Sequence, residues 1–186
     1  FKHVAVGGTA HCTIATTGKL YCWGTDNTFG QLGSGDTAPH TTLNQVGIAS
    51  NWRFVTLSGS HTCALDDAGG LSCWGLDGFG QLGDGGGDGS TTSYSVTPLP
   101  VMAGSQFLDV DAEGYATCAV RSDGVLYCWG NNGQIGVNTK VPKAMDSASD
   151  WAKIRLSGSH ACAVKKSGKM YCWGANDAGQ LGLPIG

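Results

Sequence analysis

Eight cysteines are the residues of this sequence with the clearest capacity for chemistry. They form four pairs whose members stand ten positions apart: Cys12 with Cys22, Cys63 with Cys73, Cys118 with Cys128, and Cys162 with Cys172. Such pairs can be disulfides, zinc ligands or buried thiols. Zinc needs closely spaced ligands, such as Cys-x-x-Cys or a Cys/His cluster, and the sequence has neither. Four equivalent pairs with no cysteine left over therefore predict disulfides and an oxidising compartment.

The histidines lack the partners that catalysis would need. His61 and His160 hold equivalent repeat positions, where the other repeats have Ala10 and Ala116. We interpret both histidines as structural side chains that hydrogen-bond neighbouring loops. The sequence shows no nucleophile–base pair, phosphate loop or metal cluster. It therefore predicts no catalytic residue, no metal and no cofactor, and we expect that the chain is not an enzyme; it identifies no binding residue.

Two further groups have a ligand-binding alternative. Asp84, Asp88 and Ser90 carry oxygen atoms of the kind that binds calcium, but their spacing differs from an EF-hand loop, and Asp-Gly-rich segments are usually flexible surface. A tryptophan after each second cysteine could stack on carbohydrate. Its fixed place beside a cysteine favours packing between neighbouring repeats instead. These tryptophans are Trp23, Trp74, Trp129 and Trp173.

Each cysteine pair lies on a predicted β-hairpin, because two short apolar segments flank a turn rich in Asp and Gly. If the second turn centres on Ala68, Cys63 faces Cys73 and Leu65 faces Leu71 on one side of the sheet, with the tryptophan on the other. Directly opposed residues of antiparallel strands are close enough for a disulfide. A glycine suited to the left-handed loop position recurs in every hairpin: Gly18, Gly69, Gly124 and Gly168.

Two more elements recur around the hairpin. An aromatic residue eleven positions before each first cysteine opens a predicted short strand: Phe1, Trp52, Phe107 and Trp151. A Gly-Gln-aliphatic-Gly sequence follows each Trp-Gly and predicts a tight buried loop, in which the glutamine amide satisfies backbone groups. These structural glutamines are Gln31, Gln81, Gln134 and Gln180.

The spacing of the repeats predicts an all-β propeller. The period from tryptophan to tryptophan is 51, 55 and then 44 residues, and the length varies only in the connectors. Periods near fifty with several strands per repeat indicate propeller blades and not a helical solenoid. The 31 glycines and the 13% of charged residues are typical of short strands with Gly-rich turns. The predicted repeats are 1–51, 52–106, 107–150 and 151–186, with no domain boundary between them.

Charge and hydropathy exclude several classes of partner. The formal net charge is −3 and no run of Lys or Arg is present, which argues against a nucleic-acid or anionic-membrane surface. No apolar stretch approaches transmembrane length, so we expect no membrane insertion. Because Phe1 already holds a repeat position, we expect the chain to belong to a longer polypeptide.

The repeat closely resembles the RCC1-like repeat family (regulator of chromosome condensation type). The residues that carry the resemblance are Gly59-Ser60-His61-Thr62, Leu71, Trp74-Gly75 and Gly80-Gln81-Leu82-Gly83. The resemblance implies a propeller of four-stranded blades, typically seven, that binds other macromolecules through its loops and rims. This chain departs from the family in two ways: intracellular members lack the cysteine pairs, and four repeats are too few to close the usual ring. It therefore resembles the secreted, disulfide-containing variety, as an incomplete propeller.

We expect a secreted or cell-surface module that works by protein–protein contact, as an adhesive or structural scaffold. Its partner is then another protein, further blades of the same parent chain, or another copy through self-assembly. One alternative is a secreted propeller-type enzyme inhibitor, although Tyr94 and Phe79 are almost the only aromatic residues in the connectors. Another is a subunit of an extracellular filament or surface assembly. The cysteine pairs argue against intracellular guanine-nucleotide exchange.

Overall fold

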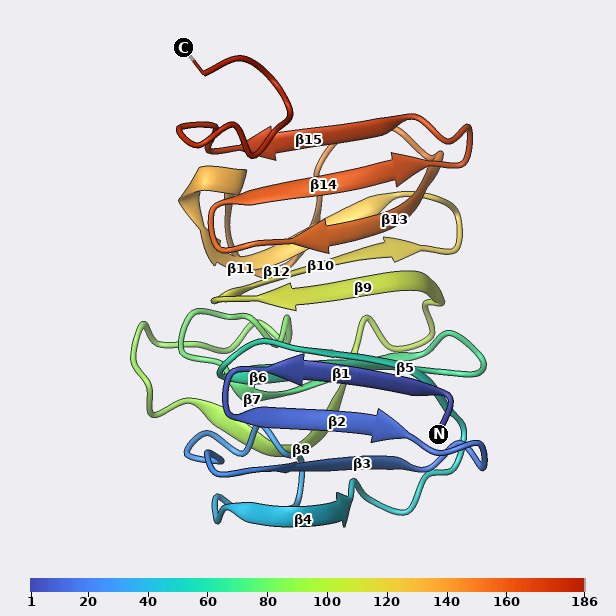
Figure 1. Cartoon of the computed structure of the whole chain (residues 1–186), viewed down its shortest axis with the longest axis vertical. Helices are drawn as coiled ribbons and strands as arrows, with labels where there is room; N and C mark the ends of the chain where they lie inside the picture. Colours follow the sequence, from blue (N-terminus) through green and yellow to red (C-terminus); the bar gives the residue numbers. More distant parts are fainter. Residues whose placement is uncertain (186) are drawn as a thin grey trace.

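Four antiparallel sheets follow one another along residues 1–185, which the computed structural model describes. We number them blades 1 to 4 in chain order; in Figure 1 blades 1 and 2 occupy the lower half of the view and blades 3 and 4 the upper half. Blade 1 contains β1 (His3–Gly7), β2 (Ala10–Ile14), β3 (Leu20–Gly24) and β4 (His40–Gln45). Blade 2 contains β5 (Trp52–Leu57), β6 (His61–Asp66), β7 (Leu71–Leu76) and β8 (Tyr94–Val101).

Blade 3 has four strands and blade 4 has three within the described residues. Blade 3 contains β9 (Phe107–Glu113), β10 (Ala116–Arg121), β11 (Leu126–Asn132) and β12 (Val137–Ala144), with a short 3-10 helix, η1 (Gly133–Ile135), before β12. Blade 4 contains β13 (Trp151–Leu156), β14 (His160–Lys165) and β15 (Met170–Gly174). Within residues 1–185, no helix is long and apolar enough to cross a membrane.

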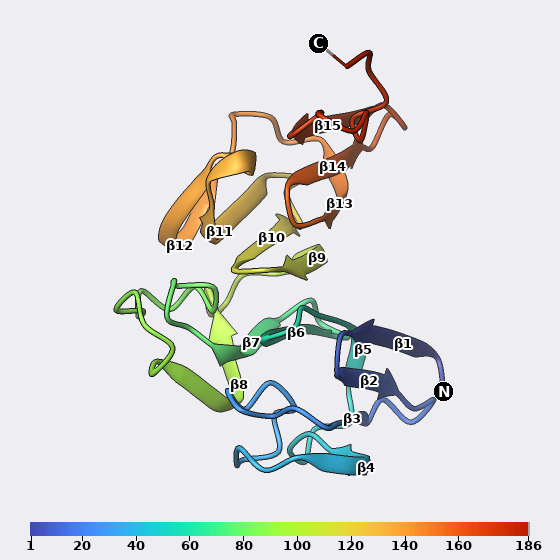
Figure 2. The same cartoon turned by 60° about the vertical axis from the view of Figure 1, so that its left-hand side comes forward.

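Each blade is a meander in which neighbouring strands pair in chain order. The first strands of successive blades contact one another: β1 with β5, β5 with β9, and β9 with β13. Figure 2 shows the blades fanning around these first strands, with β4, β8 and β12 away from them. This arrangement confirms the predicted β-propeller blades.

The central hairpin of each blade has the predicted register. In blade 2, Cys63 pairs with Cys73 and Leu65 pairs with Leu71. Disulfides join Cys12 to Cys22, Cys63 to Cys73, Cys118 to Cys128, and Cys162 to Cys172. The hairpin-turn glycines have the left-handed φ that the sequence predicted: 80° at Gly18, 90° at Gly69, 88° at Gly124 and 83° at Gly168.

A second glycine explains the Trp-Gly dipeptide. Gly75 has a φ of 101°, a backbone conformation that residues other than glycine rarely adopt. A Cβ atom at this position would lie 2.5 Å from the carbonyl oxygen of Ser60. The same oxygen accepts a hydrogen bond from the Leu76 N–H at 2.9 Å. The chain therefore needs glycine where β7 passes close to the start of β6.

The hydrophobic core lies between blades, and its two sides follow the two faces of the hairpin. The face of blade 2 that carries Cys63, Cys73 and Leu65 packs against Phe107 and Trp129 of blade 3. Equivalent clusters join blade 1 to blade 2 and blade 3 to blade 4. The disulfides of blades 1 to 3 thus belong to inter-blade cores, and Trp74, Trp129 and Trp173 each pack toward the preceding blade.

The outermost strands lie in segments that the sequence predicted only as variable connectors. β8 falls within the longest connector and contains Pro98 and Pro100. Proline cannot donate a ladder hydrogen bond, so it is tolerated mainly in edge strands. β8 pairs on one side only, with β7. An edge strand with such a composition has little of the apolar alternation by which strands are identified.

Candidate functional site

The tryptophans and Gly-Gln loops hold adjacent blades together through one carbonyl group per loop. The Gln31 carbonyl oxygen accepts hydrogen bonds from Trp74 Nε1 at 3.0 Å and from Thr62 Oγ1 at 2.7 Å. The Gln81 carbonyl oxygen accepts the same pair from blade 3, from Trp129 Nε1 at 2.9 Å and Thr117 Oγ1 at 2.8 Å. Both tryptophans are fully buried. This placement agrees with packing between blades and leaves these two side chains unavailable to a carbohydrate.

The glutamine side chains act within their own loops. Gln31 Oε1 accepts from the Phe29 N–H at 3.0 Å, and Gln81 Oε1 accepts from the Phe79 N–H at 2.9 Å. Gln180 Oε1 accepts from the Ala178 N–H at 2.8 Å. The backbone-satisfying role of the amide therefore appears in blades 1, 2 and 4.

Blade 3 differs from this pattern at Gln134, which is exposed and not part of a core. Its connector is shorter, and η1 replaces the wider loop of the other blades. The inter-blade bond consequently shifts by one residue, because Trp173 Nε1 donates to the Ile135 carbonyl at 3.2 Å. Trp23 and Trp173, which lie on the first and last blades respectively, are half-buried.

His61 is a structural side chain, as the sequence predicted. It is fully buried, with Nδ1 2.8 Å from Ser58 Oγ and Nε2 2.9 Å from Thr117 Oγ1 of blade 3. Burial lowers the pKa of His61 to about 4. The imidazole is therefore neutral at pH 7 and joins two blades. Its counterpart His160 is half-buried.

A row of connectors forms the candidate interaction site. The connections 25–39, 77–93 and 133–136 leave equivalent ends of β3, β7 and β11. They lie along one edge of the molecule, at the left of Figure 1. We call these residues the loop rim. Loops on a rigid β scaffold are where binding residues usually occur.

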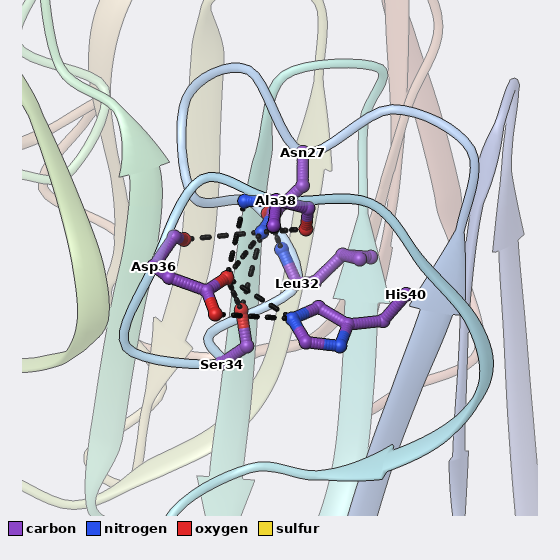
Figure 3. Close-up of polar contacts among 6 residues, drawn as sticks. All are labelled: Asn27, Leu32, Ser34, Asp36, Ala38 and His40. Carbon is purple, nitrogen blue, oxygen red and sulfur yellow. Dashed lines mark hydrogen bonds and ion pairs between the residues drawn. The ribbon is translucent and has the colours of Figure 1, made fainter.

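The blade 1 part of the loop rim is organised by a buried amide, as Figure 3 shows. Asn27 is 1% exposed, and its Oδ1 accepts from the Leu32 N–H at 2.9 Å. Its Nδ2 donates to Ser34 Oγ at 3.1 Å, to the Asp36 carbonyl at 3.0 Å and to the Ala38 carbonyl at 2.8 Å. One side chain therefore closes the whole loop. The sequence signal for it is the polar residue four positions before the repeated glutamine.

Ser34, Asp36 and His40 have the residue types of a hydrolase triad but not its geometry (Figure 3). Ser34 Oγ donates to Asp36 Oδ1 at 2.8 Å, and His40 Nε2 lies 3.0 Å from the same oxygen. A triad needs the serine hydroxyl bonded to the histidine, which acts as its base. Here the carboxylate stands between them. The hydrogen bond from His40 lowers the pKa of Asp36, so the carboxylate is ionised and holds the loop.

The blade 2 part of the loop rim contains the residues with a calcium alternative. Asp84 Oδ1 accepts from the Gly86 N–H at 2.7 Å, and Asp88 Oδ1 accepts from Ser90 Oγ at 2.6 Å. These oxygens are thus engaged within their own loop. Among residues 1–185, no group of three or more His, Cys, Asp or Glu side chains is arranged to hold a metal ion.

Acidic residues on β9 tie the first strands of three blades together. Asp111 Oδ1 accepts from Thr56 Oγ1 of blade 2 at 2.7 Å, and Oδ2 accepts from the Leu156 N–H of blade 4 at 2.7 Å. Burial raises the pKa of Asp111. Asp109 Oδ2 accepts from Arg155 Nη1 at 2.7 Å. These roles could not be predicted from the sequence, because the partners come from different repeats.

The chain resembles known proteins in sequence and in fold. The profile of the family described as "Regulator of chromosome condensation (RCC1) repeat" matches residues 1–31, 52–81, 109–134 and 151–180. The chain is 32% identical over 146 residues to probable E3 ubiquitin-protein ligase HERC4 of Homo sapiens. That match covers 75% of this chain and 13% of HERC4, so the chain spans a small part of this relative.

Two solved structures share the fold at low identity. Prp20p from Saccharomyces cerevisiae superimposes with a TM-score of 0.82 at 19% identity, over 98% of this chain and 47% of Prp20p. The CRINKLY WD40 ectodomain of the Arabidopsis thaliana receptor kinase ACR4 gives a TM-score of 0.57 at 19% identity, over 97% of this chain and 56% of the ectodomain. The profile matches include the central hairpin of every blade and more than half of the sequence. The chain therefore belongs to the RCC1 repeat family.

Proposed function

We propose that this chain is an extracellular propeller module that binds another protein through its loop rim, as a structural or adhesive scaffold. The observation that carries the proposal is the set of four disulfides, one in the central hairpin of each blade. Disulfides of this structural kind persist in oxidising compartments and are rare in the cytosol. The ACR4 neighbour, an ectodomain, shows that a related fold occurs outside the cell.

Protein contact is the activity that the scaffold supports best. The buried polar residues hold blades and loops in place, and the exposed chemistry lies on connectors of variable length. Prp20p, which has the same fold, has binding properties to Gsp1p and histones. The exposed residues of these loops can change without disturbing the inter-blade cores. The loop rim is therefore where we place the partner.

The test compares charge changes on the two opposite rims. The rim variant combines Thr37→Glu with Thr91→Lys, at two exposed positions of the loop rim. The matched control combines Lys19→Glu with Asp67→Lys, which lie in hairpin turns at the other ends of the strands. Each labelled protein is applied to surface-protein fractions from its source, with crosslinking and mass spectrometry to identify contact sites. We expect crosslinks from the loop rim that the rim variant weakens and the control retains. Contacts confined to the hairpin-turn rim would contradict the proposal.

A second candidate follows from the two outer faces of the arc: a further blade or a second copy docks there. Trp23 and His11 of blade 1 lie with ring centroids 5.6 Å apart. Together with Gly8, Thr9 and Thr41 they line an open hollow of about 350 Å³. Trp23 is the counterpart of Trp74, which receives the loop of the preceding blade. At the other end of the arc, the Gln180 loop of blade 4 is the counterpart of the Gln31 and Gln81 loops, whose carbonyl groups bind a tryptophan of the next blade. We therefore propose that the four repeats act as part of a longer propeller or assembly.

A further inference from the structure

The position that closes each wide loop after the third strand of a blade is occupied by an amide in blades 1 and 4 and by a carboxyl group in blade 2. Asn27 in blade 1 and Asn176 in blade 4 accept a backbone N–H through Oδ1, from Leu32 and Leu181 respectively. Each also donates through Nδ2 to carbonyl oxygens farther along its loop; Asn176 donates to the Pro184 carbonyl at 3.1 Å. The amide thus combines one acceptor with one donor.

Blade 2 has Asp77 at this position, which keeps the acceptor of the amide but not its donor. Asp77 is 3% exposed, and its Oδ1 accepts from the Leu82 N–H at 2.9 Å. Within residues 1–185, this is the one hydrogen bond that the carboxyl group accepts from the backbone. Oδ2 takes the place of the amide donor. An ionised Asp77 would therefore present an acceptor where blades 1 and 4 present a donor.

The loop places a second carboxyl group opposite this oxygen. Asp84 holds the position equivalent to Ser34, which accepts the Asn27 amide in blade 1. Asp77 Oδ2 and Asp84 Oδ1 converge on Gly86: a Cβ atom there would lie 2.5 Å from the first oxygen and 2.8 Å from the second. Two ionised carboxylates so close together, with one of them buried, repel each other.

We propose that Asp77 and Asp84 share one proton, and that this proton closes the 77–93 loop against blade 3 in mildly acidic solution. Asp77 Oδ2–H then donates to the Asp84 carboxylate, as Asn27 Nδ2 donates to Ser34 Oγ. When the proton leaves to solvent, two negative charges remain and the loop opens. The proposal concerns this loop alone and holds whether or not the rim binds a protein.

The charges around the pair agree with a shared proton. Burial, followed by the charge of Asp84 and its hydrogen bond, raises the pKa of Asp77 to about 6, whereas the Leu82 N–H and Lys140 act in the opposite direction. Lys140, on β12, donates through Nζ to the Gly87 carbonyl at 2.5 Å. Asp88, the other acid in the loop, is exposed, and its hydrogen bonds from Ser90 lower its pKa. Asp88 therefore stays ionised and does not compete for the proton.

Closure connects the loop to the neighbouring blade. The Gly85 N–H donates to the Lys140 carbonyl at 3.1 Å, and the Gly89 N–H donates to the Gly78 carbonyl at 2.7 Å. Both donors follow Asp84 in the sequence, and the second bond returns to Gly78, the residue after Asp77. Release of the proton would weaken both, which changes the surface that blades 2 and 3 present together.

The first test is a carbon NMR titration of the aspartate carboxyl groups in the intact, oxidised chain. We expect the Asp77 carboxyl carbon to titrate near pH 6, and to return toward the ordinary aspartate range in Asp84→Asn. An Asp77 midpoint in the ordinary range in the unmodified chain would overturn the proposal. A midpoint unchanged by Asp84→Asn would overturn the sharing.

The second test measures hydrogen exchange of Gly85 to Gly89, corrected for intrinsic rates, at pH 5 and pH 7.5. A pKa difference of one unit changes the closing equilibrium about tenfold, so we expect protection to fall about tenfold or more at the higher pH. Asp77→Asn, which restores the amide of the other blades, should keep the loop protected at both values. The reciprocal pair Asn27→Asp with Ser34→Asp should transfer the pH dependence to blade 1.

Three results would contradict the shared proton. One is equal protection of the unmodified loop at pH 5 and 7.5, and another is an Asp77→Asn loop that still opens. The third is restored protection at pH 7.5 on addition of millimolar calcium, but not of sodium at equal ionic strength. That result would mean that a metal cation, and not a proton, closes the loop. Protection independent of calcium supports the proton.

Discussion

Single buried polar residues at the inter-blade contacts connect stability to pH. His61 is neutral and fully enclosed between Ser58 and Thr117. Its folded pKa of about 4 lies below the ordinary value of 6.5. The unfolded chain therefore binds more protons between these two values than the folded chain does. The stability contribution is fully present above pH 6.5 and is lost as the pH falls toward 4.

We expect His61→Gln to lose less stability in acid than the unmodified chain. The difference between the two pKa values corresponds to about 3 kcal/mol. The measurement is the free energy of unfolding of both proteins at pH 7.5 and pH 4, by chemical denaturation with the disulfides intact. Asp77 contributes with the opposite sign, since its raised pKa favours the folded state in acid, but it is present in both proteins and cancels. Parallel pH profiles would show that His61 does not titrate as described.

The tryptophans allow a matched comparison of the same residue in two environments. Trp74→Ala removes a fully buried ring and its bond to the Gln31 carbonyl, so we expect a loss of about 3–5 kcal/mol in unfolding free energy. Trp23→Ala removes a half-buried ring from the outer face of blade 1 and should cost less. Equal losses would contradict the assigned inter-blade role of Trp74.

For single residues, the sequence predicts the roles that recur at the same position of every repeat. It does not predict the roles of residues whose hydrogen-bond partners lie in other blades. The ten-residue cysteine spacing and the opposed leucines were sufficient to predict the register of Cys63 with Cys73. The Gln31 carbonyl is different, because a backbone oxygen carries no residue-type signal. Asp111 was missed since Thr56 and Leu156 lie in other blades, and only the fold brings them to it.

The hairpins are the elements on which the stability of each blade depends. Replacing Cys63 and Cys73 together by alanine removes a disulfide that joins residues ten positions apart. This should lower the unfolding free energy by about 2–3 kcal/mol. Denaturation of the double variant beside the equivalent Cys12/Cys22 variant measures this. Both bridges close loops of the same length, so similar losses are expected. No loss in either variant would contradict a stabilising role for the bridges.

Three strands of each blade could be predicted from the sequence, and the fourth could not. The hairpin strands carry paired apolar residues on one face, and the first strand opens with an aromatic residue. β4, β8 and β12 instead pair at one edge, and their residues are mostly half-buried or exposed. Solvent-facing edge strands need no apolar alternation. For the same reason the Asn27 and Asp77 loops before them were predicted only as variable connectors.

For the whole molecule, the arc of blades has two faces that lack a neighbour within residues 1–185. We expect the isolated chain to self-associate, because Trp23 is only half-buried and Met170 and Tyr171 are exposed. Sedimentation at low and high concentration measures this, with Trp23→Asp as a variant that should weaken association. A stable monomer at all concentrations, with one cooperative unfolding transition, would show that the faces need no partner.

The central claim is that this family member works outside the cell as a disulfide-bonded module. Its most direct test is alkylation of the native protein, taken from separated cell and extracellular fractions of its source, before any reduction. We expect the protein in the extracellular or cell-surface fraction, with no cysteine alkylated and with peptides linked 12–22, 63–73, 118–128 and 162–172. A cytosolic protein whose cysteines react as free thiols would contradict the account.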